Sequence, residues 1–160
     1  LDDADSLLSE KGYRPEIVFF DLPGTLKSDG VIKTLSQMDY IFTPVSADRF
    51  VVESALQFVM MFNDNLVTTG LAKTKDISLF WTMVDGREKT GLYDLYGKLF
   101  AENNFRVLDT RLPDSKRFRR EPSDDRKSVF RSTILPPDTS MLKGSRIREL
   151  SEEICSIING

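Results

Sequence analysis

The chain has 160 residues, 40% of them hydrophobic, and a formal net charge of −3, which suits one globular domain with its own core. Because it contains no histidine, Ser/His/Asp triads, Cys/His pairs and most zinc sites are excluded. A single cysteine excludes an internal disulfide and predicts a cytoplasmic location, and no apolar run approaches the roughly 20 residues of a membrane span.

The first predicted elements are a short helix and a buried strand. Residues 1–11 are acidic and compatible with a helix, and Gly12 is a suitable helix stop. Ile17–Phe20 form an unbroken run of β-branched and aromatic residues, which is typical of a strand covered on both faces of a parallel sheet. The run ends in Asp21, so the sequence predicts that this carboxylate lies on a strand tip.

A helix, a strand and a longer helix are predicted next. Ser28 or Asp29 can cap a helix whose apolar residues recur at helical spacing, namely Val31, Ile32, Leu35 and Met38. Tyr40–Val45 has the composition of a second buried strand. Residues 48–62 predict a helix with one apolar face, formed by Val51, Ala55, Phe58, Val59 and Phe62.

The second half of the chain repeats this alternation. Residues 63–75 are polar and predict a loop, after which Ile77–Val84 and Phe105–Thr110 predict a third and a fourth strand. Between them lies a helical stripe of Leu92, Leu95, Tyr96, Leu99 and Phe100. Val129–Leu135 predict a short extended segment, and residues 145–158 a final helix with a face of Ile147, Leu150, Ile154 and Ile157.

Strands and helices alternate four times, which predicts a single α/β domain over residues 1–160. Such an alternation favours a doubly wound, mostly parallel sheet with helices on both faces. Ligands bind such sheets at the carboxyl ends of the strands, so the residues that follow each strand are the candidates for function.

Asp21 is followed by Leu22, Pro23, Gly24 and Thr25. A carboxylate on a strand tip followed by a glycine turn can hold hydrated Mg²⁺ while the glycine amide faces a terminal phosphate. Asp, Pro and Gly are also the standard residues of an ordinary turn, so this motif alone leaves both interpretations open.

A phosphoacceptor receiver domain is a competing interpretation of the Asp21 strand, with Thr43 at the end of the second strand. A receiver also needs acidic residues after an earlier strand and a lysine, usually before proline, at the end of the last strand. Asp2 and Asp3 have no strand before them, and the chain contains no Lys-Pro pair. The receiver interpretation is therefore disfavoured.

The order of four segments resembles the ParA/MinD/Soj family of partition ATPases, which belongs to the P-loop NTPases. The segments are Ile17-Val18-Phe19-Phe20-Asp21-Leu22-Pro23-Gly24, Ile41-Phe42-Thr43-Pro44-Val45, Thr82-Met83-Val84-Asp85-Gly86-Arg87, and Thr110-Arg111-Leu112-Pro113. Residues 145–154, with the acidic pair Glu152 and Glu153, resemble the closing helix of the family. The resemblance covers residues 5–158, and within the family the chain resembles the ParA-like proteins of bacterial conjugative or mobilisable transposons.

The resemblance implies roles for the matched residues. Asp21 would be the Walker B carboxylate that organises Mg²⁺ in catalysis, and Gly24 would lie near the γ-phosphate. Asp85, Arg87 and Pro113 would lie where the family surrounds adenine. The full-length protein would bind Mg-ATP in the bacterial cytoplasm, form a homodimer and respond to a partner of the centromere-binding type.

One departure from the family concerns the phosphate-binding loop. The family's Lys-Gly-Gly-x-Gly-Lys-Ser/Thr motif should precede the Asp21 strand, but residues 1–16 contain one glycine and no such pattern. A P-loop holds phosphates with backbone N–H groups and a lysine. We therefore expect this motif upstream of Leu1, the chain to be a C-terminal fragment that lacks the P-loop strand, and the chain alone to bind no nucleotide and to be inactive.

Residues 111–131 hold eight Lys or Arg against four acids. Seven of these cations are candidates for contacts with DNA phosphates, as ParA proteins bind DNA without sequence preference: Lys116, Arg117, Arg119, Arg120, Arg126, Lys127 and Arg131. A solvated loop and helix face is the alternative interpretation of the same charges.

Two functions of different classes remain open from the sequence. The first is the C-terminal part of an ATPase that partitions or positions the DNA of a plasmid or mobile element. The second is a non-catalytic α/β interaction module that has lost nucleotide chemistry.

Overall fold

The computed structural model describes residues 2–22, 29–87, 91–115 and 139–160. These residues form two compact units. The first consists of Leu1–Ile41 and Met61–Asp76, and the second of Phe42–Met60 and Ile77–Gly160.

The first unit begins with α1 (Asp2–Glu10), which ends as the sequence predicts. Gly12 has a φ of 68°, in the left-handed region that favours glycine. The N–H of Gly12 donates to the carbonyl of Ser9, and that of Tyr13 donates to the carbonyl of Leu8. This pair of bonds is the Schellman motif, which satisfies the last carbonyls of the helix.

The prediction of a strand at Ile17–Phe20 is wrong. Residues 13–22 contain neither helix nor strand, and the side chains of Val18 and Phe19 are 45% and 69% exposed. Asp21 is therefore not on a strand tip, and it is exposed to solvent. The physical reason is pairing: none of residues 14–22 makes a backbone hydrogen bond to another described residue, and an apolar run becomes a strand only beside another strand.

The rest of the first unit is built around α2 (Asp29–Leu35), which buries Val31 and Leu35. The helix is shorter than predicted, and Met38 lies beyond its end. The predicted cap at Ser28 lies outside the described residues. Residues 73–75 run beside the chain that leaves α2, because Lys73 and Lys75 donate their N–H groups to the carbonyls of Ser36 and Asp39.

The sheet has three strands in the order β1-β2-β3, where β1 is Tyr40–Val45, β2 is Asp76–Trp81 and β3 is Arg106–Val107. The strands are parallel, with Ser78 paired to Arg106 and Leu79 to Val107. The bounds of β1 match the prediction, β2 ends before the predicted Val84, and β3 is shorter than the predicted Phe105–Thr110. Within the described residues β1 forms one edge, and its Pro44 is exposed there.

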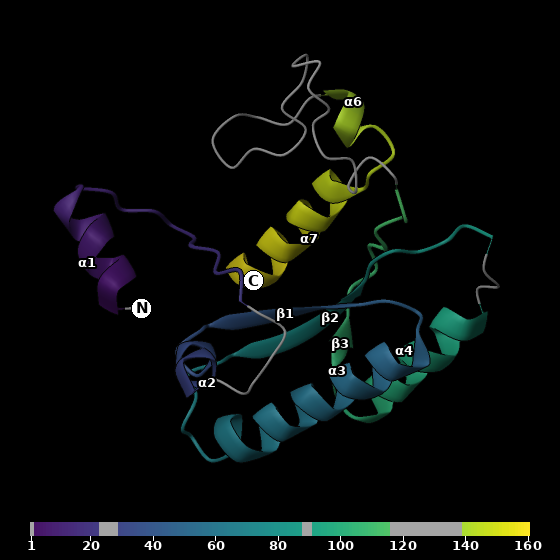
Figure 1. The fold of residues 1–160 in the computed structure, drawn as a ribbon, viewed down its shortest axis with the longest axis horizontal. Helices are drawn as coiled ribbons and strands as arrows, with labels where there is room; N and C mark the ends of the chain where they lie inside the picture. The colour runs from purple at the N-terminus through teal and green to yellow at the C-terminus, as the bar shows by residue number, and fades with distance from the viewer. Residues whose placement is uncertain (1, 23–28, 88–90, 116–138) are drawn as a thin grey trace. The chain divides into compact units, whose positions relative to one another are not determined.

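Helices lie on both faces of this sheet within the second unit. Figure 1 shows α3 (Arg49–Phe62) and α4 (Gly91–Glu102) on one face and α7 (Ile147–Asn159) on the other. A short helix, α6 (Thr139–Leu142), precedes α7. The chain is thus a mixed α/β protein with a small parallel sheet, and it has three described strands where the sequence predicted four.

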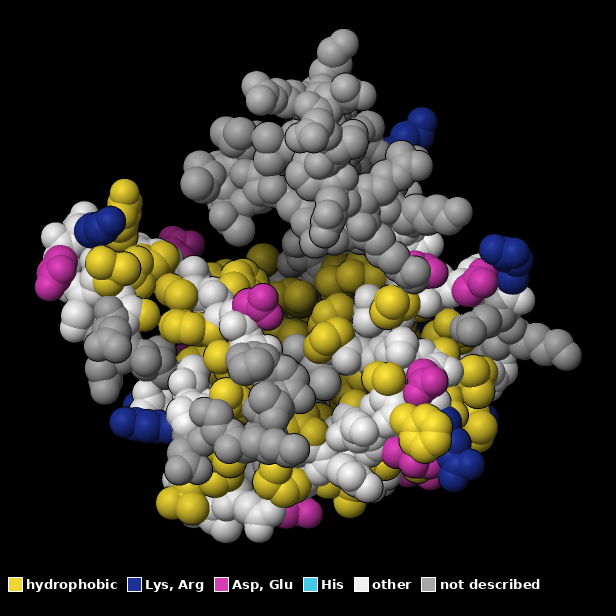
Figure 2. Space-filling model, viewed as in Figure 1, with side chains coloured by type: hydrophobic (Ala, Val, Ile, Leu, Met, Phe, Trp, Pro, Cys, Tyr) yellow, Lys and Arg dark blue, Asp and Glu magenta, His cyan; other side chains and the backbone are white. Residues whose placement is uncertain are grey.

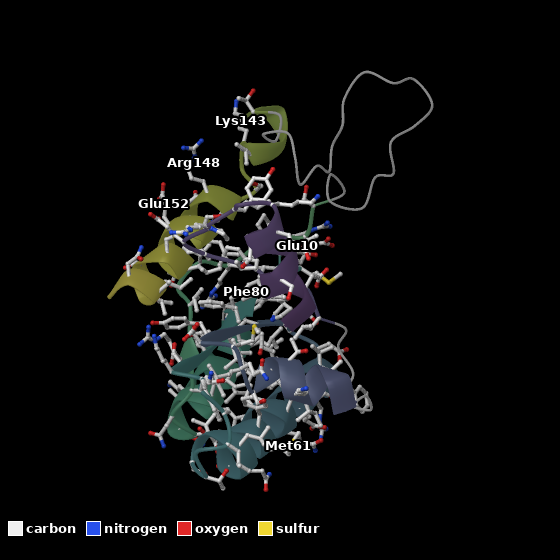
Figure 3. The ribbon with its side chains drawn as sticks, turned by 90° about the vertical axis from the view of Figure 1, so that its left-hand side faces the viewer. Glu10, Met61, Phe80, Lys143, Arg148 and Glu152 are labelled. Atoms are coloured by element: carbon white, nitrogen blue, oxygen red, sulfur yellow. The ribbon has the colours of Figure 1, made fainter. Side chains whose placement is uncertain are left out.

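The core of the second unit is an aromatic cluster between β2 and α4. Trp81, which is 2% exposed, lies 5.1 Å from Tyr93 in an edge-to-face arrangement. The rings of Tyr96 and Phe100 lie 6.4 Å and 6.1 Å from that of Trp81. Because neighbouring side chains of a strand point to opposite faces, Phe80 points to the side of the sheet on which α7 lies, where Figure 3 labels it.

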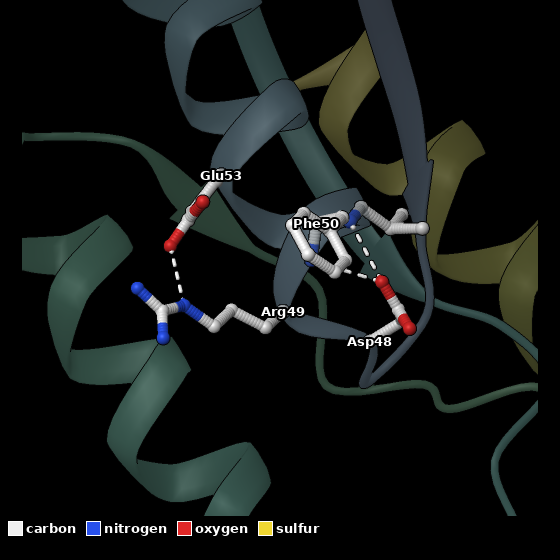
Figure 4. Close-up of polar contacts among 5 residues, drawn as sticks. Asp48, Arg49, Phe50 and Glu53 are labelled. Carbon is white, nitrogen blue, oxygen red and sulfur yellow. Dashed lines mark hydrogen bonds and ion pairs between the residues drawn. The ribbon is translucent and has the colours of Figure 1, made fainter.

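Asp48 begins α3, as predicted. Its Oδ1 accepts hydrogen bonds from the N–H groups of Phe50 and Val51 at 2.9 and 3.1 Å (Figure 4), which satisfies two donors of the first turn. The helix buries Val52 and leaves Val51 39% exposed, so the predicted apolar face was wrong at that position. An exposed ion pair joins Arg49 to Glu53 at 2.7 Å, and this hydrogen bond raises the pKa of Arg49 above its ordinary value.

Two further expectations need correction. In α4 the sequence placed Leu95 on the buried stripe, but Leu95 is 62% exposed and Tyr93 is buried in its place, because Tyr93 meets Trp81. The loop predicted at residues 63–75 begins with one π-helical segment, Asn63–Val67, before the chain becomes irregular. Val129–Leu135 lie outside the described residues.

Exposed hydrophobic side chains remain on both units. Figure 2 shows them as yellow surface among the charged groups, and the largest exposed fractions belong to Phe50, Phe19, Leu71, Tyr13 and Leu95. In the part of the chain that the structure describes, no helix combines the length and the apolar character needed to cross a bilayer.

Candidate functional site

The candidate site lies at the carboxyl ends of β2 and β3, where the chain continues as two paired segments. Val84 forms a parallel bridge with Pro113. The N–H of Val84 donates to the carbonyl of Leu112 at 3.0 Å, and that of Asp114 donates to the carbonyl of Val84 at 2.9 Å. The two segments that the sequence analysis assigned to one site are therefore adjacent in space.

The pairing changes register between the strands and this bridge. Leu79 pairs with Val107, and Val84 pairs with Pro113. Between them, the N–H of Leu112 donates to the carbonyl of Trp81, which places Arg111 opposite Trp81. Two positions from Leu79 to Trp81 thus face four positions on the second segment, which bulges by two residues there, and three positions from Trp81 to Val84 face two. Such a bulge bends a strand and changes the direction of its side chains, and bulges are frequent beside active sites.

Asp85 and Arg87 are held together directly after this pairing. The carboxylate of Asp85 accepts the N–H of Arg87 at 3.0 Å and lies 3.4 Å from its Nε. The Arg87 side chain is 94% exposed, so the ion pair itself adds little stability. The pair places a carboxylate and a guanidinium close together beyond the carboxyl end of β2. The carboxylate belongs to Asp85, the residue after Val84.

Met83 lies in the left-handed region, with a φ of 56°, and its side chain is 53% exposed. This conformation is uncommon for a residue with a side chain and costs about 1 kcal/mol or more. The backbone here turns sharply between the end of β2 and the bridge at Val84. The neighbouring hydrogen bonds of Val84 and Asp114 offset that cost.

The loop after β3 is held on one side by a carboxylate of α7. Glu153 accepts the N–H of Asp109 through Oε1 at 2.7 Å and the N–H of Thr110 through Oε2 at 2.9 Å. Thr110 is only 5% exposed, and a buried N–H without a partner would cost about 1–3 kcal/mol. This pair of bonds therefore ties the helix to the loop.

Arg111 ties the same loop to α4. Its guanidinium lies over the ring of Tyr93 at 5.1 Å and 3.5 Å from the carboxylate of Asp94. A cation over an aromatic face is attracted by the quadrupole of the ring. The loop that carries Pro113 is thus anchored to helices on both faces of the sheet.

The predicted site residues are distributed as follows. Asp85, Arg87 and Pro113 are brought together in the second unit. Asp21 belongs to the first unit, where it is exposed on the irregular segment. Gly24 lies outside the described residues, as do the seven candidate DNA-binding cations, Lys116, Arg117, Arg119, Arg120, Arg126, Lys127 and Arg131.

Among the residues that the structure describes, no group of three or more carboxylate or thiol side chains has a metal-binding arrangement. A single carboxylate such as Asp21 still suits Mg²⁺, because this ion keeps several of its waters and takes one or two protein ligands. The chain at Val84 and Pro113, beyond the carboxyl ends of β2 and β3, offers one carboxylate and one exposed guanidinium, those of Asp85 and Arg87.

Comparisons of the chain with protein-family models, with curated proteins and with solved structures found no match. The function has to be inferred from the residues and their geometry.

Sequence reasoning missed the two residues that anchor the loop. Glu153 was noted only as part of an acidic pair, and Arg111 only as a member of the segment 110–113 and of the basic stretch 111–131. The available signal was weak: Glu153 lies beside Ile154 near the apolar face of its helix, where a carboxylate needs a partner. Nothing in the sequence indicates that the partners are backbone N–H groups 43 and 44 residues away.

Proposed function

We propose that this chain carries the magnesium-side aspartate and the adenine side of a ParA-type ATPase that partitions or positions DNA. In this proposal the phosphate-binding loop is supplied by sequence outside the 160 residues. The observation that carries the proposal is the pairing of Val84 with Pro113.

That pairing supports the proposal because it joins two segments whose roles the family resemblance implies. The segments 82–87 and 110–113 lie 23 residues apart in the sequence at their nearest ends, and the resemblance implies that both surround one base. They form adjacent segments, with Asp85 and Arg87 directly after the bridge. The carboxyl end of a parallel sheet is also where nucleotides bind in folds of this class.

The chain's own residues would then act as follows. Pro113 and the backbone at Val84 would form an apolar wall for the base, and the Asp85 carboxylate would accept a hydrogen bond from an amino group. The exposed guanidinium of Arg87 would cover the solvent-facing side of the base. Asp21 would hold Mg²⁺ through its bound waters, and such an ion would supply charge neutralisation for phosphoryl transfer.

The test begins with the gene upstream of Leu1. We expect an open reading frame that continues upstream and encodes a glycine-rich loop with lysine. In the longer protein, Asp21→Ala should reduce Mg-ATP hydrolysis by about a hundredfold or more, whereas Asp85→Ala should chiefly raise KM. A reading frame that begins at Leu1 without such a loop, or full turnover by Asp21→Ala, would refute the proposal.

Binding to DNA is a separate part of the proposal and rests on the charge of residues 111–131. Affinity for a random duplex should fall steeply as salt increases, because each neutralised phosphate releases a counterion. Replacing Arg119 and Arg120 by Ser should make this salt dependence shallower, and Arg148→Ser on α7 is the matched control. No binding at low salt would refute this part.

The non-catalytic interaction module is favoured by one observation, the absence of strand structure at residues 13–22 in the described chain, together with the exposed Phe19. An aspartate that is not fixed by a strand is poorly placed for metal chemistry. The same upstream sequence decides between the two functions, since only the ATPase requires a phosphate-binding loop.

A further inference from the structure

Two aspartates of the chain directly precede a glycine, Asp29 before Gly30 and Asp85 before Gly86. An aspartate in this position can react with the backbone that follows it, because glycine has no Cβ to hinder the approach of its nitrogen to the aspartate side chain. The local backbone decides whether this reaction occurs in a folded protein. The two pairs have different surroundings, so the structure distinguishes them.

The pair of Asp29 and Gly30 lies in a helix. Both residues belong to the first turn of α2 (Asp29–Leu35), where the backbone ψ is held near the helical value. A ring between the carboxyl carbon of an aspartate and the next backbone nitrogen requires that ψ of the aspartate leave the helical region. Asp29 can therefore react only after the helix has opened locally, and the free energy of this opening lowers the rate.

The pair of Asp85 and Gly86 lies outside helix and strand, directly after the bridge at Val84. Gly86 is exposed, and apart from its chain neighbours no described residue has an atom within 4 Å of a Cβ added to it. Its N–H makes no hydrogen bond to another described residue. Within the described chain, neither helix nor sheet therefore fixes the nitrogen that would react.

The carboxylate of Asp85 is folded back along the chain that follows it. Its Oδ1 accepts the N–H of Arg87 at 3.0 Å and lies 3.4 Å from the Arg87 Nε. The bond to the Arg87 N–H closes a ring of atoms that contains both the carboxyl carbon of Asp85 and the backbone nitrogen of Gly86. The bond therefore holds this carbon near the nitrogen that would attack it.

We propose that Asp85 is a site of spontaneous isoaspartate formation in the folded protein, and that Asp29 is not. The nitrogen of Gly86 forms a bond to the carboxyl carbon of Asp85 and loses its proton, and a carboxyl oxygen leaves as water. Water then adds to the former backbone carbonyl of the resulting succinimide and breaks its bond to the nitrogen. Loss and uptake of water balance, so the mass is unchanged and no further reactant is needed.

The product differs from aspartate in its backbone and in the position of its charge. The main chain gains a methylene group, because it now runs through the former side-chain carbonyl, and the free carboxylate is attached to Cα. The oxygen that accepts the Arg87 N–H is then part of the backbone. Loss of the Asp85 carboxylate from a base site is a consequence that rests on the proposed function, whereas the reaction itself does not.

The experiment incubates the 160-residue chain without nucleotide in neutral buffer, so that its outcome is independent of the proposed function. One sample is folded and one is unfolded in guanidinium chloride. Isoaspartate is assigned by electron-transfer fragmentation of the separated peptides, because it has the mass of aspartate. In the folded chain we expect about tenfold more isoaspartate at Asp85 than at Asp29. In the unfolded chain the two sites should react alike, since neither backbone is then fixed.

Gly86→Ala is the matched variant, and Gly30→Ala is its control. The Cβ added at residue 86 has open space, but it hinders the nitrogen, so isoaspartate at Asp85 should fall to the level of Asp29. Gly30→Ala should leave Asp85 unchanged. Equal amounts at the two sites in the folded chain would overturn the proposal, as would isoaspartate at Asp85 that forms only in the unfolded chain. The comparison of folded and unfolded chain decides the proposal even if a variant does not fold.

Discussion

Two apolar runs of similar composition, Ile17–Phe20 and Tyr40–Val45, have different structures. The second is β1, with Ile41 and Val45 buried to 7% and 1% exposure. The first is irregular, with Phe19 69% exposed. β-Branched and aromatic residues therefore favour a strand only where a neighbouring strand accepts their backbone hydrogen bonds.

The difference lies in what surrounds each run. Beyond β1 and β2 the pairing continues, as the N–H of Thr82 donates to the carbonyl of Val45 at 2.8 Å, and α3 follows at once with its cap at Asp48. Residues 14–22 make no backbone hydrogen bond within the described chain. Strand formation here depends on long-range partners that no local pattern contains.

The largest expected effect on the free energy of unfolding distinguishes the buried sheet from the irregular segment at residues 13–22. Trp81→Ala should lower the free energy of unfolding by about 3–5 kcal/mol, because it leaves a cavity among three aromatic rings. Phe19→Ala should change it by less than about 0.5 kcal/mol, since the ring is largely exposed. Urea denaturation followed by circular dichroism measures both.

A loss of about 2 kcal/mol or more in Phe19→Ala would contradict the comparison, because it would mean that the ring is buried in solution. In that case the run would be a strand with a partner, as the sequence predicts. Tyr13→Ala, whose ring is 64% exposed, is the control for removing an aromatic side chain from the same segment.

A smaller effect is expected at the helix that follows β1. Asp48→Ala should lower the free energy of unfolding by about 1 kcal/mol, because it removes the acceptor for the N–H groups of Phe50 and Val51. Asp64→Ala, at an exposed carboxylate bonded to the side chain of Asn63, should stay within about 0.5 kcal/mol of the unmodified chain. Equal losses in the two variants would mean that the cap does not stabilise α3.

The smallest effects concern two glycines and should have opposite signs. Gly97 lies inside α4 with no atom within 4 Å of an added Cβ, so Gly97→Ala should stabilise the protein by about 0.5–1 kcal/mol. Gly12 has equal space but a φ of 68°, so Gly12→Ala should destabilise it by about 1 kcal/mol. Thermal melting of both variants checks the signs. Stabilisation by Gly12→Ala would show that the segment before Ile17 is not fixed by the end of α1.

Local signals predicted the parts of the fold that depend on local physics. The stop at Gly12, a helix over residues 48–62 and the strand Tyr40–Val45 are confirmed. Helix faces were less predictable, because burial of Val52 in place of Val51, and of Tyr93 in place of Leu95, depends on which neighbour each side chain meets. A change of one or two positions in the buried face leaves the helical period of the sequence unchanged.

The candidate site could be predicted in part. The chain order of residues 82–87 and 110–113 indicated one site, and their adjacency follows from parallel pairing. The contacts of Glu153 with backbone N–H groups could not be predicted, because every residue except proline has such a group and the sequence does not show which of them need a side-chain partner. Asp21 was expected on a strand tip, but residues 14–22 make no backbone hydrogen bond to another described residue and form no strand.

Pro44 has a consequence for the solubility of the protein. In β1 the carbonyl of Val45 faces β2, so the backbone of Pro44 faces the other side, where the described residues contain no further strand. Proline has no N–H to offer there, and a strand of another molecule that approached this edge would lose a hydrogen bond in the middle of its pairing. Replacing Pro44 would expose a continuous template, and growth of intermolecular sheets would then begin at β1.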